Sequence, residues 1–260
     1  VHVHRIPYNT DRYGRYSELT GLFHGLNYSH AVYERVKQLI LSNGIQVVDS
    51  PLWRFEGLVT AVSNIIPVIV RLQTSLRQVA RLQGRQDDDA HLIGEMEHTL
   101  IEEADYLIPN SYATLEAIKK VYDNLSITNR RYTVVPHGIA PVPDGLTRPF
   151  DLEEELDSFT VLYVGRLEQR KGILDLFEAI PRVLEQIPNA EFVITGQDNS
   201  KRDGFQHRMG VDYPSYFAHR YGKWLSKVEF TGFVSDEKLQ ELYQTCDLFV
   251  APSLYESFGL

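Results

Sequence analysis

The apolar positions of residues 159–260 follow two periodicities in turn, and this alternation predicts the fold of that part. The run 159–164 is mostly apolar and has the length of a buried strand. Behind it, apolar residues recur every three or four positions and predict one face of a helix, at Ile173, Leu176, Phe177, Ile180, Val183, Leu184 and Ile187. We expect further strands at 191–195, 228–230 and 247–251, and helices at 216–225 and 236–245. Strands that alternate with helices favour a parallel sheet with covering helices.

The first 140 residues show the same alternation, so the whole chain is predicted to be α/β. We expect helices at 18–42, 57–64, 91–103 and 112–122. The first of them should stop at Asn43-Gly44, because this pair is a helix-stop signal. We expect strands at 1–6, 45–48, 67–72, 106–108 and 132–135. In the second half, the polar stretch 197–214 is expected to be an exposed loop, and Ser235 to cap the helix that follows it.

A change of composition between the two halves predicts an interdomain linker. Three prolines and a glycine lie between 141 and 149, and five acidic residues follow between 151 and 157. Prolines and like charges resist packing. We therefore expect a first domain at 1–140, a linker at 141–158 and a second domain at 159–260, with a ligand site in the cleft between the domains. The alternative is one long surface loop.

Charge and cysteine content restrict the function. The 260 residues carry 26 basic and 35 acidic side chains, a formal charge of −9. This charge argues against general affinity for nucleic acid or anionic lipid, so an anion site must be local. The single Cys246 excludes a disulfide framework, which fits a reducing cytoplasm. It directly follows the expected helix 236–245 and continues the apolar stripe of Leu239, Leu242 and Tyr243, so we expect it to be buried and inert.

The sequence suggests a fragment without membrane or export signals. It starts at Val1 without a methionine and stops at Leu260 within a motif. No run approaches the ~18 apolar residues of a membrane helix, and the first residues lack the apolar core of a signal peptide. His2 and His4 share one strand face, but no third ligand is evident, so we expect no metal site there. His98 is expected on a solvated helix face.

The segment Gly165–Gly172, GRLEQRKG, is the strongest candidate for chemistry. A strand leads into a short loop with glycine at each end, and a helix follows. Gly165 lets backbone approach a ligand, and the helix offers unpaired N–H groups to an anion. Arg166 forks onto phosphate oxygens, while Lys171 supplies a compact charge. The segment thus suits a diphosphate; the alternative is a solvated basic loop.

The last residues, DLFVAPSLYESFGL, are the second candidate. A strand ends at Pro252-Ser253, and Glu256 lies at what is expected to be the start of a helix. Such a turn offers N–H groups to phosphate, and a carboxylate there accepts hydrogen bonds from sugar hydroxyls. Taken alone, an acid at the position of Glu256 is more often a helix cap than a ligand.

These two segments, with VEFTGFVSDEKLQELY between them, resemble the donor-binding domain of the family 4 retaining glycosyltransferases. ADYLIPNS, VVPHGI, DSPLWRFEG and PVIVRLQTS resemble segments of the first domain of that family. The resemblance covers nearly the whole chain. It implies the GT-B fold, in which two Rossmann-like domains face a cleft, with both domains incomplete here.

The resemblance also implies roles for residues. It implies that Arg166 and Lys171 neutralise the donor diphosphate, and that Glu256, the first acid of a Glu-x7-Glu motif, contacts donor sugar hydroxyls. The turn beside the sugar or phosphate corresponds to Ser257, Phe258, Gly259 and Leu260. Phe233 and Val234 match the backbone that frames the nucleobase, and His137 matches a position beside the hinge that contacts the donor.

The same resemblance implies an activity. It is transfer of a sugar from a nucleotide-sugar donor to a glycan, lipid-linked or small-molecule acceptor, with retained anomeric configuration. No cofactor and no obligatory metal are expected. The implied location is the cytoplasm, where contact with the inner face of the membrane stays open.

The sequence departs from the pattern of this family at three places, and these departures keep alternative functions open. The second acid of the Glu-x7-Glu motif falls beyond Leu260, and the first strand and glycine-rich loop of the family are absent, so we expect this fragment to be inactive. Gln73 stands where the family often has a histidine near the anomeric centre, and glutamine cannot carry a proton. A non-catalytic nucleotide- or glycan-binding module is therefore the alternative from another class. A phosphorylase or epimerase is a third, although no pyridoxal motif is evident.

Overall fold

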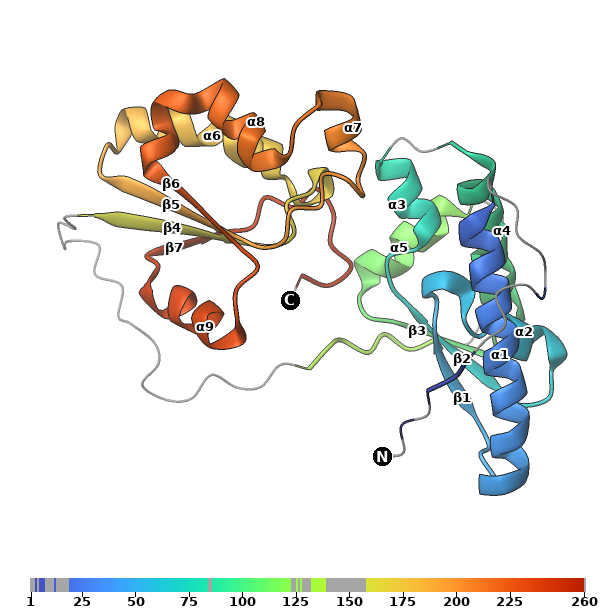
Figure 1. Ribbon diagram of the computed structural model, residues 1–260. Helices are drawn as coiled ribbons and strands as arrows, with labels where there is room; N and C mark the ends of the chain where they lie inside the picture. The colour runs from blue at the N-terminus through green and yellow to red at the C-terminus, as the bar shows by residue number, and fades with distance from the viewer. Residues whose placement is uncertain are drawn as a thin grey trace. The chain divides into compact units, whose positions relative to one another are not determined.

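The computed structural model describes residues 3, 5–7, 12, 19–83, 86–122, 125, 127, 132–138 and 158–259. The chain forms two compact units (Figure 1). One comprises Val1–Gly138 together with Glu256–Leu260, and the other comprises Ile139–Tyr255. Residues 141–157, most of the expected linker, lie outside the described residues. Each unit has its own sheet and its own hydrophobic core, so each can be understood separately.

The second unit is built on a four-stranded parallel sheet. Its strands are β4 (Phe159–Val164), β5 (Ala190–Thr195), β6 (Val228–Gly232) and β7 (Leu248–Val250), in the order β6-β5-β4-β7. Helices α6 (Ile173–Gln186) and α8 (Tyr213–Tyr221) cover one face, and α9 (Asp236–Thr245) covers the other (Figure 1). The sequence predicted the bounds of β4 and α9 correctly, and Ser235 caps α9 by accepting a hydrogen bond from the Lys238 amide.

Aromatic rings fill the core between α6, α8 and the sheet. Phe177 of α6 and Phe217 of α8 are fully buried with ring centroids 5.0 Å apart, and both rings contact Phe230 of β6. The predicted apolar face of α6 is buried at five of its seven positions; Val183 is only half-buried, and Ile187 is exposed because it follows the last helical residue. This packing fixes α6, and with it the position of the N-terminus of α6.

The prediction of an exposed loop at 197–214 is wrong. Asn199, Asp203, Phe205 and Tyr213 are buried, and the short helix α7 (Phe205–Met209) forms within the segment. The rings of Phe205 and Tyr213 stack with centroids 4.1 Å apart. Polar composition misled the prediction, because here the polar side chains bond to the backbone inside the unit instead of to water.

The first unit is a three-stranded parallel sheet with helices around it. The strands β1 (Val48–Pro51), β2 (Val68–Leu72) and β3 (Tyr106–Pro109) lie in the order β1-β2-β3. The described helices are α1 (Thr20–Asn43), α2 (Leu58–Ser63), α3 (Leu76–Leu82), α4 (Asp88–Glu103) and α5 (Tyr112–Val121). As predicted, α1 stops at Gly44, whose φ of +63° is left-handed and whose amide bonds to the Ile40 carbonyl.

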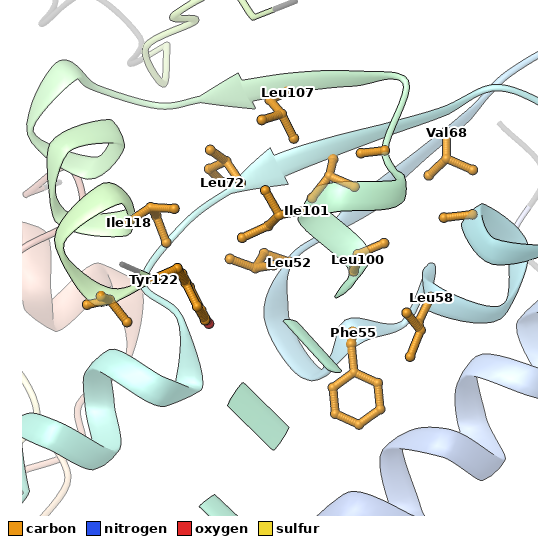
Figure 2. Close-up of a cluster of buried hydrophobic side chains, with 14 of the residues drawn as sticks. Leu52, Phe55, Leu58, Val68, Leu72, Leu100, Ile101, Leu107, Ile118 and Tyr122 are labelled. Atoms are coloured by element: carbon orange, nitrogen blue, oxygen red, sulfur yellow. The ribbon is translucent and has the colours of Figure 1, made fainter. Parts of the chain in front are cut away.

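The core of the first unit gathers side chains from strands, helices and the segment after β1. Figure 2 shows this cluster, which includes Leu52, Leu72, Leu100, Ile101, Leu107 and Ile118, all shielded from solvent. Phe55, in the 3-10 turn Trp53–Phe55, is buried in the same cluster. The core thus holds β2 and the segments that follow β1 and β2 in place.

Three predictions for the first unit need correction. The strand expected at 45–48 begins three residues later, at Val48, and α3 was not predicted although Ser75 caps it through the Gln78 amide. The expected strand 132–135 contributes only single backbone bonds, from Thr133 to Leu107 and from Val135 to Pro109. Within the expected strand 1–6, the described residues Val3, Arg5 and Ile6 are not in a strand, while His2 and His4 lie outside the described residues.

Two side-chain predictions also fail. Cys246 is only half-buried, because α9 packs on the sheet with one side and has no fully buried residue. His98 does not lie on a solvated face: it is half-buried and stacks on the Tyr122 ring at 5.6 Å. Separately, none of the described helices has both the length and the apolar character needed to cross a membrane.

Candidate functional site

The candidate site lies where the loops after β4 and β7 leave the sheet. These two strands are neighbours and run parallel, so their carboxyl ends meet at one edge. From β4 the chain passes to β5 on one side, while β7 returns to pair with β4 on the other. In an open α/β sheet, ligands bind at the carboxyl ends of the strands at such a reversal of strand order.

Direct contacts join the two loops. The Leu254 amide donates to the Arg170 carbonyl at 2.9 Å, and the Arg170 guanidinium donates to the Tyr255 carbonyl at 3.0 Å. Gly172 has a φ of +69°, and a Cβ there would lie 1.9 Å from the Pro252 carbonyl oxygen. The two motifs that the sequence singled out are therefore packed against each other, and only glycine fits at position 172.

The cations of the β4–α6 loop differ in exposure. Arg166 is 53% exposed and lies 3.2 Å from the Glu168 carboxylate. Lys171 is half-buried at the end of the 3-10 turn Gln169–Lys171. Arg170, which the sequence analysis did not consider, is only 13% exposed and pairs with Glu168 at 2.7 Å. Arg166 and Lys171 thus lie in one loop, and the ion pair of Glu168 and Arg170 lies between them in the sequence.

The N-terminus of α6 completes this loop. Gly172 precedes the helix in a left-handed conformation and provides no side-chain cap for the first amides. Gly165 lies at the end of β4, where the Arg166 carbonyl accepts a hydrogen bond from the Tyr163 hydroxyl. An uncapped helix N-terminus beside two exposed or half-buried cations provides both partial and full positive charge for an anion.

A layer of buried polar side chains supports the loop from the segment 197–214. Asn199 donates to the Glu168 carboxylate at 2.7 Å, and the Asp203 carboxylate accepts from the Gln169 amide at 3.1 Å and from the Tyr213 hydroxyl. Burial and the Asp203 carboxylate raise the pKa of Tyr213, so its hydroxyl stays protonated. The backbones of Leu167 and Asn199 also bond to each other. Sequence reasoning missed this layer, although an apolar Phe205 and Tyr213 within a polar stretch were a signal.

The end of the chain contacts residues of the first unit, to which Glu256–Leu260 belong. The Ser257 carbonyl accepts hydrogen bonds from Ser111 at 2.9 Å and Thr114 at 2.7 Å, both in the first turn of α5 or its cap. The ring of Phe258 meets that of His137 edge to face at 5.1 Å. The structure therefore brings together two residues that the sequence analysis named for substrate binding.

For Glu256 and Gly259 the structure gives the burial and the backbone conformation. Glu256 is half-buried, and Gly259 has a left-handed φ of +76°. Leu260 lies outside the described residues. The His137 ring nitrogen lies 3.4 Å from the Asn110 amide group, which adds a polar contact at the same place.

Phe233 and Val234 follow β6, which β5 separates from β4. Phe233 is 85% exposed and Val234 is half-buried. The preceding Gly232 carbonyl accepts a hydrogen bond from the Gly196 amide at 2.8 Å, so the ends of β5 and β6 are joined. Their expected role at the nucleobase stays a prediction.

Gln73 lies in the first unit between β2 and α3, and it is half-buried. The helix after it is held by a buried acid that the sequence analysis missed: Glu97 of α4 accepts from the amides of Leu76 and Arg77 and from the Tyr122 hydroxyl. Burial raises the pKa of Glu97 to about 7. The signal was its spacing, since Glu97 lies four residues from Ile93 and Ile101 on the apolar face of α4.

The described residues contain no group of three or more His, Cys, Asp or Glu side chains arranged to hold a metal ion. Two further acids of the first unit, Asp49 and Glu56, lie in the segments that follow the start of β1. Asp49 pairs with Arg71 at 2.7 Å, and both side chains are exposed. Burial raises the pKa of Glu56, which is half-buried.

Residues 147–260 match the glycosyl transferases group 1 family. The chain is 29% identical over 193 residues to an uncharacterized glycosyltransferase of Methanocaldococcus jannaschii, an alignment that covers 70% of this chain and 45% of that protein. It is 32% identical over 168 residues to glycogen synthase of Mycobacterium tuberculosis, covering 64% of this chain and 36% of the relative. The chain thus spans less than half of these curated relatives.

Structural similarity extends over both units. Sucrose-phosphate synthase of Thermosynechococcus elongatus superposes with a TM-score of 0.65 at 24% identity, over 91% of this chain and 57% of that one. The fold is therefore GT-B, as the family resemblance implied. The match to a glycosyltransferase domain falls on the residues that build the β4–α6 and β7 loops.

Proposed function

We propose that this chain contains the donor-binding machinery of a retaining glycosyltransferase that uses a nucleotide-diphosphate sugar. One observation carries the proposal: the loop with Arg166 and Lys171 lies at the N-terminus of α6, beside the β7 loop, in the part that matches the glycosyl transferases group 1 family. A diphosphate is the ligand class that two cations and a helix N-terminus together suit.

The charges of the loop suit the chemistry of the transfer. When the glycosidic bond to the nucleotide breaks, negative charge grows on the leaving phosphate, and positive charge grows on the anomeric carbon. Arg166 and Lys171 stabilise the leaving phosphate more than the bound donor, which lowers the barrier. Because these cations and the α6 amides supply the positive charge, we propose that no metal ion is required.

The residues at the end of the chain would hold the sugar. Glu256 accepts hydrogen bonds from sugar hydroxyls, and the turn 257–260 offers backbone amides. His137 and Phe258, which contact each other, line this place in the first unit. In this proposal Phe233 and Val234 frame the nucleobase, and Gln73 faces the acceptor.

A second candidate function is a GT-B module that binds a nucleotide or glycan without transfer. Gln73 favours it, because an amide side chain can hold a ligand by donating and accepting hydrogen bonds but cannot act as a general acid or base. The acceptor is proposed to be a glycan or a lipid-linked sugar in the cytoplasm, at the inner face of the membrane in the lipid-linked case.

The test is donor binding followed by turnover. In a thermal-shift screen with UDP-, GDP- and ADP-sugars, we expect one nucleotide class to raise the melting temperature, because a ligand that binds only the native state stabilises it. In the full-length protein, Arg166→Ala and Lys171→Ala should each lose about 2–4 kcal/mol of transition-state stabilisation, measured as release of sugar from the donor. Arg182→Ala, on the exposed side of α6, is the matched control.

The outcomes separate the two candidates. Binding that depends on Arg166 with sugar release supports the transferase. Binding that depends on Arg166 without any sugar release or transfer supports the non-catalytic module. Unchanged binding and turnover in both alanine variants would contradict the assignment of the diphosphate to this loop.

A further inference from the structure

Glu168 is the most deeply buried charged side chain in the β4–α6 loop. Its side chain is 5% exposed, and both of its oxygens are in use. One oxygen lies 2.7 Å from Arg170 and 3.2 Å from Arg166, and the other accepts from Asn199 at 2.7 Å. A single carboxylate therefore joins both arginines of the loop to the segment 197–214.

Arg170 extends this connection to the β7 loop. One of its terminal nitrogens pairs with Glu168, while the other donates to the Tyr255 carbonyl at 3.0 Å. The Arg170 carbonyl also accepts from the Leu254 amide. The rigid fork of a guanidinium bonds two acceptors at a fixed separation, which a lysine cannot do. Tyr255 directly precedes Glu256, so Arg170 fixes the backbone one residue before the proposed sugar ligand.

Burial of this ion pair needs an explanation other than stability. Removing two charges from water is costly, and apolar residues of similar size often fill such a site at least as well. What apolar side chains cannot do is orient a third charged group. Arg166 is this third charged group. Its guanidinium lies at the Glu168 carboxylate, while about half of its side chain is exposed to solvent.

We propose that Glu168 and Arg170 are positioning residues for donor binding: the buried pair aims Arg166 and fixes the backbone before Glu256 at the same time. This inference rests on the proposed function and names residues that it does not use. Neither side chain needs to touch the donor. Their effect passes through Arg166 on one side and through Tyr255 on the other.

The inference is testable because net charge and positioning predict opposite changes of diphosphate affinity for Glu168→Gln. The Glu168 carboxylate adds a negative charge to an anion site, so neutralising it should strengthen diphosphate binding if net charge decided affinity. If positioning decides, Glu168→Gln weakens binding although the loop becomes more positive. Arg170→Lys keeps the charge but loses the fork, and it too should weaken binding.

The experiment is calorimetric titration of the 260-residue chain with UDP, GDP and ADP, and with the matching nucleosides. We expect Glu168→Gln and Arg170→Lys each to weaken diphosphate binding about tenfold, the equivalent of one well-placed charged hydrogen bond, without weakening nucleoside binding. Glu178→Gln and Arg182→Lys make the same chemical changes at exposed positions of α6 and should change affinity less than about twofold. The double variant Glu168→Gln/Arg170→Gln restores the net charge of the loop and should still bind weakly.

The possible results distinguish between failure of this inference and failure of the proposed function. Diphosphate binding in Glu168→Gln that equals or exceeds that of the wild type overturns the inference. If Glu168→Gln does not fold, Arg170→Lys takes its place, and unchanged affinity there overturns the inference as well. A wild-type chain that binds none of the three diphosphates overturns the proposed function and this inference with it, whereas wild-type binding with an unaffected Arg170→Lys overturns this inference alone.

Discussion

At the scale of single residues, Glu97 shows how burial and local donors oppose each other. Its carboxyl group is fully buried in the first unit, and the amides of Leu76 and Arg77 and the Tyr122 hydroxyl all donate to it. Donors and the nearby Arg77 charge lower the pKa, but removal from water raises it more, so the pKa rises to about 7. The acid therefore titrates near neutral pH while it holds the first turn of α3.

This pKa predicts a pH-dependent stability. The folded chain binds the Glu97 proton more tightly than the unfolded chain, whose carboxyl has an ordinary pKa near 4.5. The contribution is fully present below about pH 4.5 and is lost as the pH rises through 7. The free energy of unfolding should thus fall by about 3 kcal/mol across this range because of Glu97 alone. Urea denaturation at a series of pH values measures it.

Two variants make the assignment specific. In Glu97→Gln the group cannot titrate, so this part of the pH dependence should disappear. Glu103→Gln, on an exposed position at the end of α4, should keep the pH profile of the wild type. Parallel profiles for Glu97→Gln and the wild type would show that Glu97 keeps an ordinary pKa.

At the scale of elements, the segment 197–214 differs most from its prediction, since it was expected to be an exposed loop and is folded. Its backbone continues the pairing of β4 and β5 beyond the strands, since Leu167 donates to the Gln197 carbonyl and Asn199 donates to the Leu167 carbonyl. Asp203 then ties the segment to the Gln169 amide. The segment is thus a folded support for the loop that carries Arg166.

A folded support should resist proteolysis. Although Lys201 and Arg202 are exposed, trypsin should not cut after them in the native chain, because cleavage needs several residues to unfold locally. Asp203→Ala leaves the Gln169 amide and the Tyr213 hydroxyl without their acceptor. It should lower the free energy of unfolding by about 2–3 kcal/mol and expose both sites to trypsin.

The control for this prediction is Glu185→Ala, an exposed acid of α6. It should leave both the stability and the cleavage pattern unchanged. Equal cleavage after Lys201 in the wild type and in Asp203→Ala would mean that the segment is a loose loop after all. Mass spectrometry of the fragments identifies the cut sites.

At the scale of the whole molecule, charge is the property that limits partners. The chain carries a net charge of −9, and the proposed anion site is one short loop. Long-range repulsion should keep the chain away from polyanions, while the proposed loop with Arg166 and Lys171 should still bind a small anion. This combination fits a protein whose ligand is a single diphosphate.

The corresponding prediction concerns binding to extended anionic surfaces. At about 0.15 M salt, where the screening length is about 8 Å, we expect no co-sedimentation with vesicles rich in anionic lipid and no shift of double-stranded DNA. Neutral vesicles serve as the control. Binding to anionic vesicles that weakens as salt is added would contradict the prediction and would reveal a basic surface.

The fold and the location of the candidate site could be inferred from the sequence to a large extent. The run at 159–164 and the 3.6-residue spacing after it determined β4 and α6, because burial of one face imposes a period on the chain. The same segment showed glycines and cations at the end of a strand. Local pattern contains this information, and the family resemblance added the expected role of each residue.

Only the tertiary structure decided which partners the charged groups have. No local pattern shows that Glu168 lies between Arg166 and Arg170, or that Arg170 reaches the Tyr255 carbonyl, 85 residues along the chain. The spacing of Glu97 on the apolar face of α4 indicates burial but not its donors, and nothing local shows that Asp203 is covered by neighbouring elements. Periodicity records which face of an element is buried, whereas the cost of burying a charge and the donors that offset it depend on segments distant in sequence.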